Sequence, residues 1–180
     1  MLSVFRRNPQ GATIEALYGA IVAQARNPVF YRDHGVADTV NGRLDLLMLH
    51  LVLVFERLSQ ADAAGKAAGQ AAFDRFCQDM DDHLREEGVG DLKVPKDMLR
   101  LGAAFFGRHG TYLNALRSGD RPALEAGLAR NVYQDAPDAP VASLAAYVEA
   151  AHRTLAAEDT AVLLEGRLAW PGAETPVTGS

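Results

Sequence analysis

One segment of the chain, Asn41 to Leu58, is apolar around almost its whole circumference when it is drawn as a helix. Its leucines, valines and Phe55 recur at the three- and four-residue spacing of an α-helix and extend well beyond a single face. Such a helix needs neighbours on several sides, so this one is expected at the centre of a helical bundle. Its apolar run is shorter than the ~20 residues of a membrane-spanning helix and contains Asp45 and His50.

The composition favours helices along the rest of the chain. There are 31 Ala and 22 Leu against 14 Val and 2 Ile, a bias toward helix formers and away from β-branched residues. A chain of 180 residues also buries enough surface to fold without a disulfide or metal. We therefore expect an all-α protein, a compact single-domain bundle of about six to eight helices over residues 1–170, followed by a disordered tail, residues 171–180.

Cap and turn residues predict where the other helices begin and end. Thr13 is the expected N-cap of the first helix, and Asn27-Pro28 its stop. Asp91 is the expected N-cap of a long helix that is either continuous or interrupted at its glycines. Ser59–Gly69 is expected to be a loop, although its alanines allow part of it to join the next helix. Other helices are expected at Val29–His34, Ala71–Glu87, Asp120–Val132, Leu144–Leu155 and Thr160–Leu168.

Charge and cysteine content exclude several classes of protein. With 23 Asp and Glu against 18 Lys and Arg, the net charge is -5, and a basic field for DNA is missing. Cys77 is alone, so it forms neither an internal disulfide nor a cysteine-based zinc site, which indicates a reducing compartment. The first ten residues lack the apolar stretch of a secretory signal, so no export is expected.

The charge is unevenly distributed along the chain. Residues 74–97 contain eight acidic and four basic residues, a local net charge of -4. Residues 1–32 contain four arginines and one acidic residue, a local net charge of +3. Two interpretations remain open with about equal weight: ordinary surface charge, or a partner-binding surface with a charged rim.

Motifs for catalysis are missing from the sequence. It contains no nucleophile elbow, P-loop or dinucleotide-binding motif, and Cys77 falls on an apolar stripe where a thiol is usually an inert packing residue. His50 could ligate haem, but a hydrogen-bonded core histidine is the more common case. Asp79 and His83 could face one cation, as in a metal-dependent hydrolase, but a solvated acidic face is the better interpretation. No catalytic residue, metal or cofactor is therefore expected.

Short blocks of residues between Ala16 and Tyr133 carry a further signal. In order, they are Leu17-Tyr18, Ile21 to Arg26, Phe30-Tyr31, Asp38-Thr39, Gly42-Arg43, Leu49-His50-Leu51, Asp79-Met80-Asp81, Leu84-Arg85-Glu86, Gly88 to Asp91, Lys96, Phe106-Gly107-Arg108, Tyr112 and Arg130-Asn131. Their number and order resemble the ubiquinol-cytochrome c chaperone family. The residues that this resemblance marks as client-binding or motif positions are Arg26, Tyr31, His50, Asp79, Asp81, Arg85, Gly88, Gly90, Asp91, Lys96, Arg108, Tyr112, Arg130 and Asn131.

The resemblance implies an assembly factor rather than an enzyme. Mitochondrial members work with a small partner protein, receive newly made cytochrome b and keep it competent for haem insertion and assembly into the bc1 complex. For this chain it implies nascent or haem-poor cytochrome b as the partner, and leaves open a small partner subunit and ribosome contact. Abundant Arg and Ala with three lysines suggest a bacterial source. The family then implies a cytoplasmic location, peripheral to the inner membrane. The alternative is a helical haem- or small-ligand-binding protein that uses His50.

The roles of the matched residues remain open at this stage. The charged ones, such as Arg85 and Arg108, would either brace the turn at Gly88 to Asp91 or contact the client. The methionines near the matched blocks, Met48, Met80 and Met98, would either pack in the core or make adaptable contacts with an apolar client.

Overall fold

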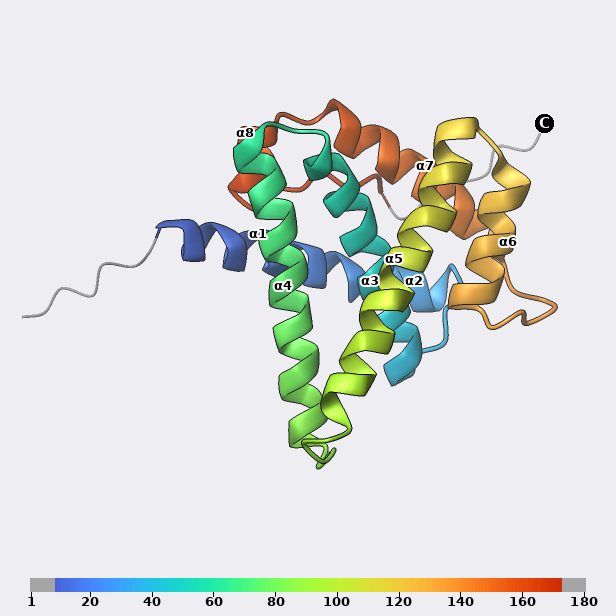
Figure 1. Ribbon diagram of the computed structural model, residues 1–180. Coiled ribbons are helices and arrows are strands. Elements are labelled where there is room, and N and C mark those ends of the chain that lie inside the picture. Colours follow the sequence, from blue (N-terminus) through green and yellow to red (C-terminus); the bar gives the residue numbers. More distant parts are fainter. Residues whose placement is uncertain (1–8, 173–180) are drawn as a thin grey trace, which may run out of the picture.

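The computed structural model describes residues 9–172, which contain eight helices and no strand, so the expected all-α fold is confirmed (Figure 1). Of the expected disordered tail, only Pro171 and Gly172 lie within the described residues. The helices are α1 (Pro9–Ala25), α2 (Val29–Arg32), α3 (Val40–Ser59), α4 (Ala63–Glu86), α5 (Val94–Ser118), α6 (Arg121–Val132), α7 (Val141–Ala157) and α8 (Thr160–Leu164).

Helix α3 lies at the centre of the bundle, as its sequence predicts. It packs against α1, α4, α5 and α7, and most of its side chains are buried. Thr39 caps its start, because the Thr39 hydroxyl accepts a hydrogen bond from the Gly42 amide at 3.1 Å. One cluster of buried side chains joins α3 to its neighbours, with Leu17 from α1, Phe76 from α4 and Tyr147 from α7.

Two helix starts differ from the sequence prediction. Helix α1 begins at Pro9, so Thr13 is not its N-cap. Helix α4 begins at Ala63, which reduces the expected loop to residues 60–62, and the Asp62 carboxylate caps the helix by accepting from the Gly65 amide at 2.9 Å. Gly65 and Gly69 serve close packing rather than a break, because a Cβ on Gly65 would lie 2.5 Å from the Ala61 Cβ.

Helix α5 runs without interruption through its three glycines. Its N-cap position is Lys93, without a side-chain cap, so Asp91 is not the N-cap that the sequence predicts. Pro95 lies in the first turn, where proline costs no hydrogen bond. At the other end of the chain, α8 ends before Leu168, because Gly166 takes a positive φ of 74°.

The outer ends of α4 and α5 project from the body of the molecule as a helical hairpin (Figure 1). Gly88 takes a positive φ of 78° at the end of α4, as predicted. No side chain from Asp81 to Lys93 is buried, and these residues are called the hairpin tip below. The tip therefore presents side chains to solvent from both helices and from the turn between them.

Candidate functional site

The residues singled out by sequence lie in four places. Arg26, Tyr31 and Asp79 line a groove between the first four helices. A second cluster, on α5 and α6, contains Arg108, Tyr112, Arg130 and Asn131. The hairpin tip and the start of α5 contain Asp81, Arg85, Gly88, Gly90, Asp91 and Lys96. His50 lies alone in the core.

The groove consists of two adjoining hollows that share Arg26 and Arg43. The first, called the arginine hollow, has a volume of about 520 Å³. The second, called the apolar trough, has a volume of about 280 Å³. The arginine hollow is lined by Arg26, Pro28, Tyr31, Arg32, Asp38 and Arg43, and the trough by Tyr18, Val22, Ala25, Arg26, Val40, Arg43, Leu44, Leu47, Asp79, Met80 and His83.

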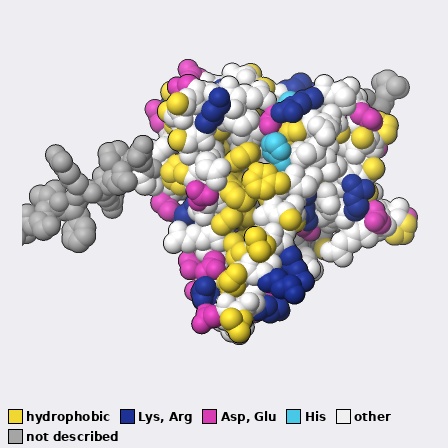
Figure 2. Space-filling view, viewed as in Figure 1, with side chains coloured by type: hydrophobic (Ala, Val, Ile, Leu, Met, Phe, Trp, Pro, Cys, Tyr) yellow, Lys and Arg dark blue, Asp and Glu magenta, His cyan; other side chains and the backbone are white. Residues whose placement is uncertain are grey.

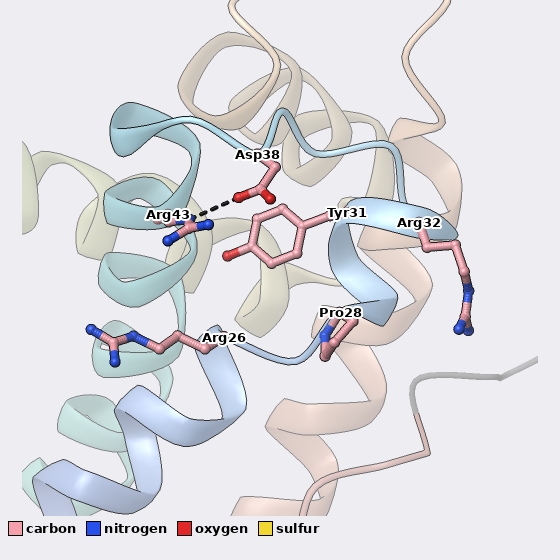
Figure 3. Close-up of a pocket in the computed structure, with 6 residues that line it drawn as sticks. All are labelled: Arg26, Pro28, Tyr31, Arg32, Asp38 and Arg43. Carbon is pink, nitrogen blue, oxygen red and sulfur yellow. Dashed lines mark hydrogen bonds and ion pairs between the residues drawn. The ribbon is translucent and has the colours of Figure 1, made fainter.

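The arginine hollow is arranged around the Tyr31 ring (Figure 3). Arg43 donates from Nε to Asp38 at 2.7 Å, and its two terminal nitrogens have no partner among the described residues. The Arg26 side chain makes no hydrogen bond or ion pair within the described part of the chain, and it lies on the same side of Tyr31 as Arg43 (Figure 3). Arg32 points away and pairs with Asp33. The hollow therefore contains one uncompensated cation, Arg26, beside a second, Arg43, with free donors.

A close backbone contact fixes the Arg43–Asp38 pair. A Cβ on Gly42 would lie 2.0 Å from the Ala37 carbonyl oxygen, so only glycine lets the preceding loop fold back onto the first turn of α3. The Thr39 cap holds the same loop. This local fold places Asp38 beside the Arg43 guanidinium on α3.

The apolar trough contains an unusual polar group. The Tyr18 side chain is 4% exposed, and its hydroxyl has no hydrogen-bond partner. Burial and the nearby Asp79 carboxylate raise the pKa of Tyr18, so the hydroxyl stays protonated. Asp79 itself pairs with Arg75, whose guanidinium carbon lies 5.4 Å from the centre of the Tyr18 ring. The Tyr18 hydroxyl is thus a buried polar group beside Asp79 in the wall of the trough, without a hydrogen bond of normal geometry among the described residues.

In the second cluster, a buried ion pair joins α5 to α3. Arg108 donates from Nη2 to Asp45 at 2.6 Å and to the Asn131 carbonyl at 3.5 Å, and both side chains of the ion pair are largely buried. Burial raises the pKa of Asp45 to about 6, although Arg108 opposes the shift. Tyr112 is also buried, and burial raises its pKa to about 12. Arg130 is exposed at the rim of a hollow beside Asp45. These contacts favour a structural role for Arg108.

At the hairpin tip, Arg85 joins the end of α4 to the following turn. It donates to Asp81 and to Asp91, both at 2.6 Å. The sequence left two roles open for these charged residues, bracing of the turn or contact with the client. The contacts of Arg85 match the first of them. Gly90 has no positive φ, unlike Gly88, and Lys96 is exposed on α5.

An exposed apolar stripe on the hairpin was missed by the sequence analysis. Leu92, Leu99 and Phe106 follow one another at seven-residue intervals and are 98%, 76% and 51% exposed. Figure 2 shows apolar side chains running down the hairpin, with Lys and Arg side chains along one edge. Phe106 rests on the rings of Phe55 and Phe73, with centroids 6.2 and 5.3 Å away. Leu99 and Phe106 share one face of α5, whereas Leu92 lies in the turn before it; their heptad spacing was the available signal, but the inward stripe of the same helix obscured it.

His50 is not placed to bind a ligand. It is fully buried, with Nδ1 2.7 Å from the Leu46 carbonyl and Nε2 2.9 Å from the Tyr147 hydroxyl. Burial lowers its pKa to about 4, so the ring is neutral. Because both ring nitrogens are engaged, neither is available to iron. This geometry matches the hydrogen-bonded core histidine rather than the haem ligand.

The Asp79–His83 pair and Cys77 are the other chemical groups that the sequence singled out. Within residues 9–172, no group of three or more His, Cys, Asp or Glu side chains could hold a metal ion, and Asp79 is engaged by Arg75. Burial raises the pKa of the half-buried Cys77, which keeps it a thiol. None of the described helices combines the length and apolar character of a membrane span.

Comparison with known proteins connects these features to a family. The sequence model of the family described as "Ubiquinol-cytochrome C chaperone" matches residues 32–170. A solved structure described as the Cbp3 homolog from Brucella abortus is 36% identical, with a TM-score of 0.85, over 95% of this chain and 96% of that one. No curated protein sequence matches the chain.

Proposed function

The chain belongs to the ubiquinol-cytochrome c chaperone family, and from this premise we propose that it is an assembly factor that binds newly made or haem-poor cytochrome b. It supports haem acquisition by that client and its incorporation into the bc1 complex, and it performs no turnover chemistry. Its location is the cytoplasmic face of a bacterial inner membrane, as a peripheral protein. A small partner subunit or a ribosome is compatible with this role.

The exposed apolar stripe is the observation that carries this proposal. Soluble monomers rarely expose aligned large apolar side chains, and such patches mark interaction sites. Leu92 and Leu99 contribute little to the fold, since most of their surface is in solvent. An apolar helix of unassembled cytochrome b would bury its surface against these two leucines. The charged edge beside the stripe keeps the free chaperone in solution.

Phe106 makes the stripe a preformed surface. Its ring is held by the rings of Phe55, Phe73 and Phe105, so little side-chain freedom is lost when a client binds. An aromatic anchor with a rigid base is typical of the residues that dominate binding energy in interfaces. The stripe thus offers one firm anchor and two fully accessible leucines.

A deletion strain tests the function. Loss of the gene should lower b-type haem absorbance and bc1 activity while the other respiratory complexes persist. Complementation with the wild-type gene should restore both. Normal bc1 levels in the deletion strain would refute the proposed function.

A pair of surface variants tests the client-binding surface. The double variant Leu92→Ser/Leu99→Ser should keep its melting temperature, because both side chains are exposed, but lose cytochrome b in affinity purification. Val40→Ser is the matched control, since Val40 is 71% exposed but lies in the groove. Loss of the client with Val40→Ser, and retention with the hairpin variant, would move the client site to the groove.

A further inference from the structure

We propose that the groove between α1, α2, α3 and α4 binds a single-chain amphiphilic anion, with its anionic head between Arg26 and Arg43 and its apolar body in the trough. This site is separate from the client surface, because the stripe lies on the hairpin and none of its residues lines the groove. The arginine hollow, of about 520 Å³, is within the range usual for small-molecule sites, roughly 300–1,000 Å³, and the adjoining trough, of about 280 Å³, is slightly below it.

The charges of the groove select an anion. Arg26 has no partner within the described residues, and Arg43 uses only its Nε for Asp38. The carboxylates that line the groove, Asp38 and Asp79, are each paired with an arginine, so neither faces the head as an unpaired anion. His83, at the α4 wall, adds no negative charge. An anionic head would therefore meet free guanidinium donors, which bind phosphate and carboxylate strongly.

The trough supplies the second half of the recognition. Its walls are mostly aliphatic, from Val22 on α1, Leu44 and Leu47 on α3, and Met80 on α4. Methionine adapts its shape to an apolar ligand more easily than a branched side chain. Arg26 and Arg43 stand at the boundary of both hollows, so one molecule can place its head and its chain at the same time.

The Tyr18 hydroxyl is independent support for a ligand. Tyr18 is buried and lines the trough, and among residues 9–172 its hydroxyl has no hydrogen bond of normal geometry, although Asp79 is nearby. Buried polar groups are nearly always hydrogen-bonded, and an exception needs an explanation. The hydroxyl has almost no accessible surface of its own, so a head-group oxygen at Arg26, which lines the same trough, would accept its proton after a rotation of the neighbouring side chains. Tyr31 cannot serve in the same way, because its hydroxyl already donates to the Ala25 carbonyl at 3.2 Å.

The test is calorimetric titration of the purified full chain with dodecyl phosphate below its micelle-forming concentration. Saturable binding of one molecule per chain is expected. Inorganic phosphate, which lacks the chain, and dodecyltrimethylammonium, which has the opposite charge, should each bind at least about tenfold more weakly. Equal affinity for either compound would overturn the proposal, since it would show an anion site without an apolar part or unspecific apolar binding. Failure of dodecyl phosphate to bind would also overturn it.

Three variants locate the site. Arg26→Gln and Tyr18→Phe should each weaken dodecyl phosphate binding about tenfold. Arg32→Gln is the matched control, because Arg32 borders the same hollow but points away, and it should bind as the wild type does. Tyr18→Phe should melt no lower than the wild type, since the hydroxyl has no partner to lose. Unchanged binding by both Arg26→Gln and Tyr18→Phe would place the ligand elsewhere.

This test is independent of the client proposal. The Leu92→Ser/Leu99→Ser variant, which alters the stripe alone, should bind dodecyl phosphate with wild-type affinity. If that variant loses the amphiphile, the compound binds on the stripe and the groove proposal is wrong. Any other failure of the groove proposal leaves the separate proposal, that the hairpin binds cytochrome b, unchanged.

Discussion

At the scale of single residues, the Asp45–Arg108 pair shows how burial decides the role of a charged side chain. The side chains are only 10% and 15% exposed, and they connect α3 to α5. Removing two charges from water is costly, and their attraction offsets this cost only while both partners are present. The contacts of Arg108, a matched motif residue, therefore support a structural role.

Replacing Arg108 with Met should lower the free energy of unfolding by about 3 kcal/mol at pH 8. The loss should shrink at pH 5, because the pKa of Asp45 is raised to about 6 and would rise further without Arg108. Because the pKa of Asp45 is higher in the folded protein than in the unfolded chain, its protonation stabilises the fold. This contribution is complete below the ordinary pKa of 3.8 and is lost as the pH rises through the pKa of the folded protein, about 6. Urea unfolding at the two pH values measures this effect.

The double variant Arg108→Met/Asp45→Asn is the control for that experiment. It removes the buried charge together with its partner and should recover most of the stability at pH 8. An equal loss at pH 5 and pH 8 would contradict the assignment. Wild-type stability of Arg108→Met, with loss of cytochrome b, would instead place Arg108 on the client surface.

His50 should make the protein sensitive to acid. Its pKa is lowered from 6.5 to about 4 by burial, so its contribution is complete above 6.5 and is lost as the pH falls through the folded value. The change in the free energy of unfolding over this pH range is roughly 3 kcal/mol, at about 1.36 kcal/mol per pKa unit. His50→Gln should flatten this part of the stability–pH curve in urea unfolding. The same variant should leave a haemin titration unchanged, and loss of a Soret shift would revive the haem-ligand interpretation.

At the scale of elements, helix type and order could be predicted, but contacts between glycines and distant residues could not. The start of α4 was placed too late because the small and polar residues of Ser59–Gly69 were interpreted as a loop. In the fold Gly65 lets α4 approach Ala61 in the preceding turn and Thr160 on α8, and Gly69 lets it approach Leu58 on α3. Helix α5 stays continuous through its glycines because side chains along it, such as Phe105 and Tyr112, are buried in the core.

The candidate site was predictable only as separate pieces. Arg26, Tyr31 and Asp79 were marked by the family resemblance, but they come from the turn after α1, from α2 and from α4. Their meeting in one groove follows from packing of those helices around α3, and no local pattern encodes it. The exposed stripe is local, but exposure cannot be read from spacing alone, because α5 also has an inward apolar stripe.

Two glycines of the turn between α4 and α5 allow a matched test. Gly88 has a φ of 78°, whereas Gly90 has no positive φ, and neither would bring a new Cβ within 4 Å of another side chain. Gly88→Ala should therefore cost about 1–2 kcal/mol from backbone strain alone. Gly90→Ala should cost almost nothing. Thermal unfolding of the two variants decides this point, and equal melting temperatures would show that the turn adapts without strain.

At the scale of the whole molecule, α4 connects the two proposed surfaces. Its Asp79, Met80 and His83 form one wall of the groove, and its last turns form one side of the hairpin. Helix α3 supports both from the centre of the bundle (Figure 1). A packed core with one projecting hairpin suits a chaperone, because the hairpin tip, which has no buried side chain, can adapt to a client while Phe106 at its base stays anchored.

Amide hydrogen exchange should reveal this division. The hairpin tip has no buried side chain from Asp81 to Lys93, so its amides should exchange through local opening at low free energy. The amides of α3, which is buried on most sides, should exchange only on global unfolding, several kcal/mol higher. Binding of cytochrome b should then protect residues 92–106 most strongly. Protection confined to α1 and α2, with an unchanged hairpin, would contradict the proposed client surface, because the apolar stripe would remain open to solvent in the complex.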